Sequence, residues 1–388
     1  MEIETASNRQ LFISFLRLGL SAFGGPAIVA HIRALSVDRH KWVSEETFRD
    51  GIVLCQSIPG ATAMQTAAYI GFRTKGISGA LVSFVGFGLP AFLLMLVLSA
   101  IYEKTRELPR VTALFTGLQV IVIAIVANAT YYFGKSTIKD VRNVLIAAGS
   151  YLSLFYGLSP FLSIVAAGLA GILLFRGTGT VPSISGPKRK DNPYRKQLAL
   201  FIAFTVAGVG ALYFADRELL ILALLMAKID LFAFGGGFAS LPLMLHEVVN
   251  VRGWLDGKTF MDGIALGQIT PGPIVITASF VGFLTNGLAG AIVATIAIFT
   301  PSFLLVIITV PFFDRLKASP IFLKVTEGIL SSFVGLLLFV TVHFTLAVSW
   351  DIVKVLLVTA ALIALFKKVG IHYIVPIAAV ISLLIFQQ

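Results

Sequence analysis

Two cations lie inside apolar segments of this sequence. They are Arg17 in the first half and Lys228 in the second, and each precedes a glycine pair by seven residues. Seven residues are about two helical turns, so cation and glycine would share one helix face. A charge within a bilayer is costly unless it faces a cavity or a partner. We therefore expect both cations to attract an anionic ligand, the alternatives being that Arg17 snorkels to the interface and that Lys228 pairs with Asp230.

The glycines that follow these cations interrupt the apolar segments. They form FGGP at 23–26 and FGGG at 234–237, and the residues concerned are Gly24, Gly25, Gly235 and Gly236. Glycine in a helix interior costs about 1 kcal/mol relative to alanine, so helix breaks are predicted. Free N–H groups at such breaks can bind an anion. Close helix packing on small residues is the alternative, but corresponding breaks in both halves favour a binding site.

A third repeated pattern places a glutamine three residues before a Pro-Gly pair. It reads QSIPG at 56–60 and QITPGP at 268–273, which gives the candidates Gln56, Pro59, Gly60, Gln268, Pro271, Gly272 and Pro273. Proline removes a backbone donor and disrupts the preceding turn, so broken helices or re-entrant hairpins are expected. The glutamine amides could then meet a freed carbonyl or a ligand oxygen. A purely structural kink is the alternative.

Other polar residues are weaker candidates. Asp230 and Glu327 could carry protons, although Glu327 could instead pair with Lys324. Asp50 and Asp262 open their segments and are expected to cap helix N-termini. Trp42 and Trp254 follow polar loops and are expected to be interfacial anchors. With one cysteine and no nucleotide or metal motif, neither a cofactor nor a metal is expected.

The composition identifies the environment in which these residues act. Of 388 residues, 57% are hydrophobic and 13% are charged, and the mean hydropathy is +0.93. Such a chain is an all-α polytopic membrane protein rather than a soluble or disordered one. The net charge of +11 fits basic cytoplasmic loops, because no basic and aromatic strip suggests nucleic-acid binding.

Apolar runs predict about thirteen transmembrane segments. Six lie within 1–175, beginning with one at 11–35; a basic cytoplasmic linker follows at 176–197, an extra segment at 198–218, and the remaining six within 219–388. The excess of Lys and Arg on the linker side places the N-terminus inside and the C-terminus outside. The loop at 36–49 is then expected outside.

The two halves are copies of one module. Residues 42–60 match 254–272 at ten of 19 positions, and the correspondence continues from Gly71 with Gly282 to Pro90 with Pro301. Because an extra segment separates the copies, the second should be inverted relative to the first. Inverted repeats are common in secondary transporters, whose sites lie at the repeat interface.

These repeated elements resemble the chromate ion transporter family in its long, two-domain form. The resemblance rests on FGGP and FGGG, on the tryptophans and on the Q-x-x-P-G elements, and it covers nearly the whole chain; Ala61 stands where the motif usually has proline. It implies export of chromate across the cytoplasmic membrane, driven by the proton motive force.

Physically, the cations, glycine N–H groups and glutamine amides could replace the hydration shell of a tetrahedral dianion. Another anion such as sulfate, or a passive channel, is the nearest alternative. An intramembrane lipid enzyme is disfavoured because no nucleophile and base pair is evident, so no enzymatic activity is expected. The oligomeric state stays open, a homodimer being one arrangement that the sequence allows.

Overall fold

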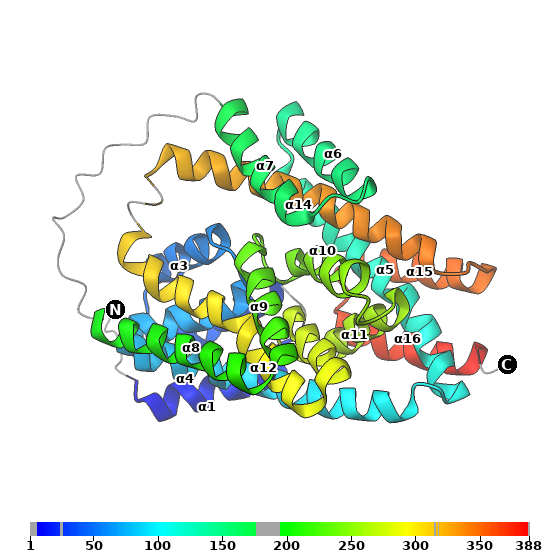
Figure 1. The fold of residues 1–388 in the computed structure, drawn as a ribbon, viewed down its shortest axis with the longest axis horizontal. Coiled ribbons are helices and arrows are strands. Elements are labelled where there is room, and N and C mark those ends of the chain that lie inside the picture. The colour runs from blue at the N-terminus through cyan, green and yellow to red at the C-terminus, as the bar shows by residue number, and fades with distance from the viewer. Residues whose placement is uncertain (1–5, 24–25, 176–194, 314–315, 317, 387–388) are drawn as a thin grey trace.

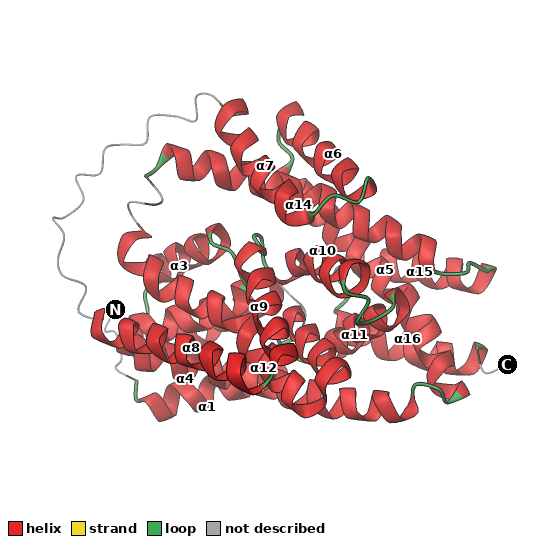
Figure 2. Ribbon diagram, viewed as in Figure 1, coloured by secondary structure: helices red, strands yellow, loops and turns green. Residues whose placement is uncertain are grey.

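The protein is a bundle of helices, and the described part of the chain contains no strand (Figures 1 and 2). The computed structural model describes residues 6–23, 26–175, 195–313, 316 and 318–386. Gly24, Gly25 and most of the predicted linker lie outside these residues. The helices are α1 (Asn8–Ser21), α2 (Pro26–Arg33), α3 (Glu45–Ser57), α4 (Thr62–Thr105), α5 (Pro109–Thr137), α6 (Val141–Phe155), α7 (Pro160–Leu174), α8 (Arg195–Ala215), α9 (Arg217–Phe232), α10 (Ser240–Met244), α11 (Gly257–Ile269), α12 (Thr277–Thr309), α14 (Pro320–Ala347), α15 (Ile352–Phe366) and α16 (Ile371–Ile385).

Apart from α8, the helices of the second half match those of the first at an offset of 211 or 212 residues. Thus α1 corresponds to α9, α3 to α11, α4 to α12, α5 to α14, and α6 and α7 to α15 and α16. Even irregular features recur. π-Helical segments occupy Ala34–Arg39 and Leu245–Val251, and the long helices α4 and α12 kink at Gly76 and Gly287, both with positive φ. The predicted duplication therefore extends to the detailed backbone.

The first apolar segment is a hairpin rather than one crossing. α1 ends at Ser21, and the chain then returns through α2, so that Arg39 lines the same cavity as Gln10 near the start of α1. Phe15 of α1 stacks on Trp42 at a ring-centroid distance of 6.4 Å. The expectation of a single span over 11–35, with the next loop on the opposite side, is therefore wrong.

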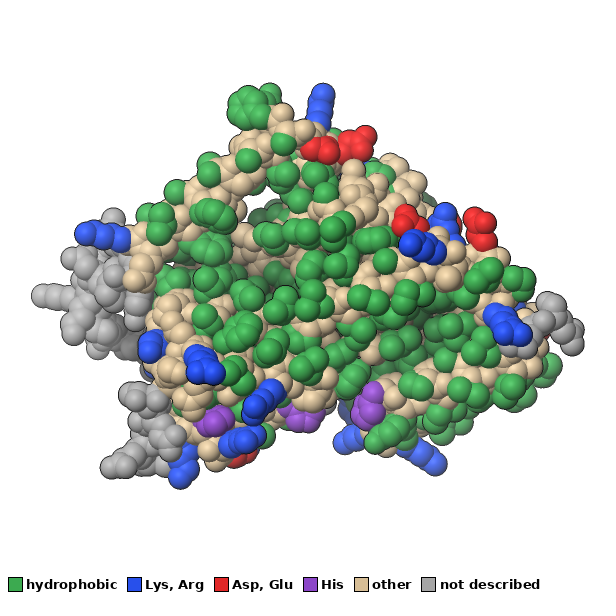
Figure 3. Space-filling view, turned by 90° about the horizontal axis from the view of Figure 1, so that it is seen from below, with side chains coloured by type: hydrophobic (Ala, Val, Ile, Leu, Met, Phe, Trp, Pro, Cys, Tyr) green, Lys and Arg blue, Asp and Glu red, His purple; other side chains and the backbone are tan. Residues whose placement is uncertain are grey.

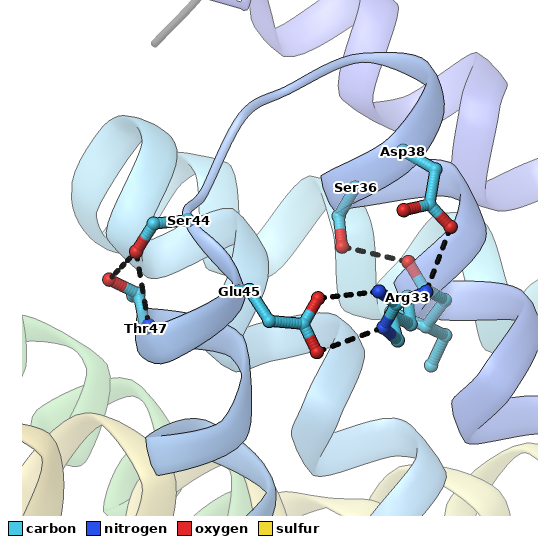
Figure 4. Close-up of polar contacts among 7 residues, drawn as sticks. Arg33, Ser36, Asp38, Ser44, Glu45 and Thr47 are labelled. Atoms are coloured by element: carbon cyan, nitrogen blue, oxygen red, sulfur yellow. Dashed lines mark hydrogen bonds and ion pairs between the residues drawn. The ribbon is translucent and has the colours of Figure 1, made fainter. Parts of the chain in front are cut away.

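A salt bridge joins this hairpin to the next. Arg33 at the end of α2 donates to both carboxylate oxygens of Glu45 at the start of α3, at 3.0 and 2.6 Å, and to Asp38 at 2.9 Å (Figure 4). Trp42 between them is only 2% exposed, so it is a core residue and not the expected interfacial anchor. Its partner Trp254 is partly buried and lies against Arg252.

The Pro-Gly elements form the second pair of hairpins, as predicted. In the first repeat α3 ends at Ser57 and α4 begins at Thr62; in the second, α11 ends at Ile269 and helical structure resumes at Ile274. The N-caps are Ser44 and Asp256, which accept from the backbone N–H groups of Thr47 and Thr259. Asp50 and Asp262 lie inside their helices, so the prediction that they are caps is wrong.

Within the described part of the chain, five helices are long and apolar enough to cross a membrane: α4, α5, α8, α12 and α14. The others are too short, since a crossing needs about 20 residues. In α4 and α12 the part before the kink belongs to a hairpin, and the part after it forms the long span. The count of thirteen crossings is not confirmed. The first repeat contributes the long helices α4 and α5, and α8 adds a third before the second repeat begins its own pair, α12 and α14. Because three long helices separate the start of α4 from the start of α12, the two repeats have opposite orientations.

Reciprocal contacts relate the repeats by a pseudo-two-fold axis. Gly60 N–H donates to the Ala233 carbonyl at 2.9 Å, and Gly272 N–H donates to the Ala22 carbonyl at 3.0 Å. The equivalent helices α5 and α14 cross where the hydroxyls of Thr130 and Thr341 lie 3.2 Å apart. Each of them packs against the terminal hairpin of the other repeat: α14 against α6 and α7, and α5 against α15 and α16 (Figure 1).

The outer surface agrees with a membrane location. Hydrophobic side chains cover most of the face in Figure 3, while Lys and Arg side chains gather toward its edges. α8 is wholly unburied along its apolar window, as expected for a lipid-facing helix outside both repeats. The Arg-rich and Lys-rich edges provide the interfacial anchoring that membrane proteins use.

Candidate functional site

A cavity of about 190 Å³ lies where the hairpins of the two repeats meet. It is lined by both repeats, through Ile28, Val29, Gln56, Ala61, Thr62, Ala63, Gly235, Gly236, Gly237, Phe238, Gly272, Pro273 and Ile274. We call it the central cavity. Of the residues predicted from the sequence, it brings together Gln56, Gly235, Gly236, Gly272 and Pro273. None of its lining residues is charged.

Helix N-termini point at the central cavity from both repeats. α4 begins there at Thr62, a helical segment at 237–251 begins at Gly237, and another at 274–309 begins at Ile274. The first turn of α2 adds Ile28 and Val29. The first N–H groups of a helix have no partner within it, and the aligned peptide dipoles give that end a partial positive charge. The cavity can therefore attract an anion without a cationic side chain.

The glycine run of the second repeat shapes one wall of this cavity. Gly235 and Gly236 have φ of +93° and +98°, a backbone conformation that residues with a side chain rarely adopt. A Cβ at Gly236 would lie 3.2 Å from the Thr62 hydroxyl of the other repeat. The predicted break is confirmed here, and it brings the backbone of one repeat close to the start of α4 in the other.

The Pro-Gly glycines hold the repeats together instead of offering donors to a ligand. The N–H groups of Gly60 and Gly272 donate the reciprocal hydrogen bonds to the carbonyls of Ala233 and Ala22. These two N–H groups are therefore engaged within the protein, and the expectation that the Pro-Gly hairpins hold the anion stays a prediction for their other groups. Pro59, Gly60 and Pro271 flank the central cavity without lining it.

Next to the cavity, a buried carboxylate fixes one hairpin. Asp230 is fully buried and accepts from the backbone N–H of Ser302 at 2.8 Å and from its hydroxyl at 3.0 Å. The same hydroxyl accepts from Ala61 N–H at 3.0 Å. Asp230 thus connects α9 to α12 and, through Ser302, to the residue that precedes α4 at the cavity.

The glutamines differ in their surroundings. Gln56 is exposed and lines the central cavity, whereas Gln268 is 6% exposed and its Nε2 has no acceptor among the described residues. The carbonyl of Pro59 accepts from Gln65 Nε2 at 2.5 Å, so Gln65 and not Gln56 meets this freed group. The sequence analysis missed Gln65 and also Thr62. The only available signal was their position just after a Pro-Gly break, where the first helical turn must lie.

Neither predicted cation lines the central cavity. Lys228 donates to Glu247 at 2.7 Å and lies over the ring of Phe161, so its partner is Glu247 rather than Asp230. Arg17 lies on the exposed side of α1, in a different cavity. The expected juxtaposition of Lys228 with Gly235 and Gly236 at one site is therefore wrong, whereas for Arg17 the glycines concerned lie outside the described residues and the prediction is not tested. Negative charge at the site would be balanced by backbone groups.

Two further acidic residues lie away from the central cavity. Glu327 is partly buried on α14, and no ion pair with Lys324 is formed among the described residues. Asp262 on α11 accepts from Tyr102 Oη and from Gln119 Nε2, both at 2.8 Å. Its contacts connect a hairpin of the second repeat to the spanning helices α4 and α5 of the first.

Comparison with known sequences identifies relatives along nearly the whole chain. A profile of the chromate transporter family matches residues 9–172 and 220–385, one match for each repeat. The interval between the two matches includes α8, the helix without a counterpart.

Individual relatives cover both repeats. An uncharacterized transporter of Methanocaldococcus jannaschii is 44% identical over 97% of this chain and 94% of its own length. The chromate transport protein of Cupriavidus metallidurans is 33% identical over 98% and 94%. The probable chromate transport protein of Synechococcus elongatus is 31% identical over 98% and 96%. No solved structure matches the chain.

Proposed function

Since the chain belongs to the chromate transporter family, we propose that it is a secondary transporter that exports chromate across the cytoplasmic membrane. The observation that supports this most directly is the convergence of helix N-termini from both repeats on the uncharged central cavity. A tetrahedral dianion can be bound there by N–H groups and dipoles alone. Binding without a cation also leaves the ion free enough to depart, as transport requires.

Within this proposal, Thr62, Gly236 and Gly237 contact the anion. Thr62 offers a hydroxyl and the first N–H groups of α4, while Gly236 and Gly237 line the cavity and carry no side chain of their own. Gln56 adds an amide donor from the exposed side of the cavity. Gln268, Pro59, Pro271 and the two reciprocal glycines keep the hairpins in register. The inverted repeats would then open the site to each side in turn.

We propose proton coupling through Asp230, with Glu327 as a second candidate. The Asp230 carboxylate is buried and is met by neutral donors of Ser302. A buried carboxylate without a cation is costly when ionised, so the site favours uptake of a proton. Protonation would alter the bond to Ser302, and Ser302 holds Ala61 at the edge of the central cavity. A proton could thus change the shape of the anion site.

Uptake of labelled chromate into inside-out vesicles, with and without an imposed pH gradient, tests direction and coupling together. Thr62→Val should lower the rate by about two- to tenfold, the range for one neutral hydrogen bond. Thr105→Val is the matched control, because its hydroxyl bonds only the Ile101 carbonyl at the far end of α4. Equal loss in both variants, or none in either, would contradict the assignment of the cavity.

Sulfate is the second candidate substrate, because it presents the same tetrahedral dianion to the same donors. Two of the relatives are named for chromate transport, whereas the relative from Methanocaldococcus jannaschii, 44% identical, is named a transporter without a substrate. Unlabelled sulfate should compete with labelled chromate in proteoliposomes if both bind the central cavity. Export without accumulation against a gradient would indicate a passive channel instead.

A further inference from the structure

A second polar cavity, of about 370 Å³, lies against α1 in the first repeat. Its polar lining residues are Gln10, Ser14, Arg17, Ser21, Arg39 and His40, and no carboxylate of the described residues lines it. We call it the α1 cavity. It shares no lining residue with the central cavity.

The hairpin of α1 and α2 creates this cavity. Gln10, Ser14, Arg17 and Ser21 recur every three or four residues and so form one polar face of α1. The π-helical end of the returning arm places Arg39 against that face. His40 follows and stacks on Trp42 at a ring-centroid distance of 4.6 Å. Two guanidinium groups, an imidazole and the Ser14 hydroxyl thus line one space, whereas the Ser21 hydroxyl donates to the Arg17 carbonyl at 3.0 Å.

Two acidic residues of the described chain close to this cavity in sequence are paired with another residue. Asp38 adjoins Arg39 in sequence, and Glu45 opens the next helix, but both carboxylates bond Arg33, at 2.9 and 2.6 Å (Figure 4). Arg33 itself is outside the cavity lining. Arg17 and Arg39 therefore form no ion pair among the described residues.

In the second repeat, the cation at the position of Arg17 is neutralised by an acidic side chain. There Lys228, the counterpart of Arg17, pairs with Glu247 at 2.7 Å. Leu35 stands at the position of Glu247, since both carbonyls accept the equivalent backbone bond at 3.1 Å, from His40 and from Arg252. One apolar residue in place of an acid thus leaves the first repeat with an unbalanced positive charge.

We propose that the α1 cavity binds one tetrahedral oxyanion group, with Arg17 and Arg39 as its principal ligands. Guanidinium groups match the oxygens of sulfate, chromate or phosphate, and the Ser14 hydroxyl adds a further donor. The group could belong to a free oxyanion or to the headgroup of an anionic lipid. The site does not depend on the proposed function, because binding at equilibrium can be measured whether or not transport occurs.

Sulfate binding to the purified protein in nanodiscs of zwitterionic lipid tests the site. In a background of Trp254→Phe and Trp350→Phe, Trp42 is the remaining tryptophan, and its stacking on His40 makes its fluorescence report on this cavity. Arg17→Gln and Arg39→Gln should each weaken the fluorescence response to sulfate about tenfold or more. Leu35→Glu should do the same while keeping both arginines, because it copies the second repeat.

Arg9→Gln is the matched control, because it removes one charge from α1 outside the cavity lining and should leave the affinity unchanged. Size-exclusion profiles identify any variant that fails to fold. If Arg17→Gln does not fold, the sulfate affinity of Leu35→Glu or Arg39→Gln tests the proposal instead. Thr62→Val should leave this response unchanged, which separates it from binding in the central cavity.

Repeating the titration with phosphatidylglycerol in the nanodiscs distinguishes the two sources. Loss of the sulfate response, with bound phosphatidylglycerol that falls in Arg17→Gln and Arg39→Gln by mass spectrometry, assigns the cavity to a lipid phosphate. A sulfate response that persists assigns it to the free oxyanion. If neither sulfate nor phosphatidylglycerol binding changes in the arginine variants, the proposal is overturned.

Discussion

The two repeats share one backbone but differ in how they treat charge. In the second repeat Lys228 is paired with Glu247, and Asp230 is bound to Ser302. At the corresponding positions the first repeat has Arg17, Leu35, Gly19 and Ala91. Gly19 there packs closely on the backbone of Phe87, with no carboxylate. Among the described residues, the second repeat therefore pairs its cation Lys228 with an acid, whereas in the first repeat Arg17 forms no ion pair and lines a cavity.

This contrast separates two tasks within one duplicated module. The reciprocal backbone bonds through Gly60 and Gly272 are kept in both copies, so they build the frame. The side chains around that frame are not kept, so they are where the copies have specialised.

The largest effect is expected from Gly60→Ala compared with Gly272→Ala. Both glycines have positive φ, +120° and +113°, but a Cβ at Gly60 would clash with the Ser302 hydroxyl and Gln65 Nε2, whereas one at Gly272 would meet only the Ala91 methyl. Strain and overpacking should destabilise Gly60→Ala by about 2–5 kcal/mol and Gly272→Ala by less. Thermal unfolding in detergent measures both. Equal shifts would show that the polar network of the second repeat adds nothing to the frame.

A smaller effect is expected from Ser302→Ala. The change removes a donor to Asp230 and the acceptor of Ala61 N–H, so it should cost about 1–3 kcal/mol. Its symmetric control is Ala91→Ser, which places a hydroxyl beside Gly272. No carboxylate can accept from this hydroxyl at the position of Asp230, because the first repeat has Gly19 there. If the unfolding midpoints of the two variants fall by the same amount, the network around Asp230 is not the stabilising element.

Next in size is the ion pair of the second repeat. Glu247 is 10% exposed and Lys228 46% exposed, so Lys228→Gln leaves the more buried charge unpaired. It should destabilise by about 1 kcal/mol, and Glu247→Gln by less, because the lysine can still reach water. A double-mutant cycle read by thermal unfolding checks this order. A larger destabilisation by Glu247→Gln than by Lys228→Gln would mean that the Glu247 carboxylate is not destabilised by the loss of its lysine partner.

The smallest effect is expected from Glu45→Gln, which breaks the exposed bridge that joins the hairpins of the first repeat (Figure 4). The hydrogen bond from Arg33 lowers the pKa of Glu45, so its stabilising effect is present above the ordinary glutamate pKa and is lost as the pH falls through the lowered value. The midpoint difference between wild type and variant should therefore vanish in acid. Gly257 stands at the matching position of the second repeat, where no such bridge forms.

Much of the fold could be predicted from the sequence. The duplication, the helical class and the breaks at Gly235 and at both Pro-Gly pairs follow from identity, hydropathy and local propensity. The number of crossings could not, because a window of apolar residues reads the same for one span as for two half-helices joined by a turn. The hairpin of α1 and α2 is such a case.

The candidate site divides in the same way. Sequence alone determined which residues could disturb a helix, since glycine and proline act through the backbone at their own position. Tertiary structure decided which backbone donors stay available for a ligand. The N–H of Gly60 donates to the carbonyl of Ala233, 173 residues away, and the N–H of Ala61 donates to the hydroxyl of Ser302, 241 residues away. It also directed Lys228 to Glu247 and Arg17 into its own cavity. The packing of the two inverted copies brings distant partners such as Gly60 and Ala233 together, so the local sequence around each residue does not predict them.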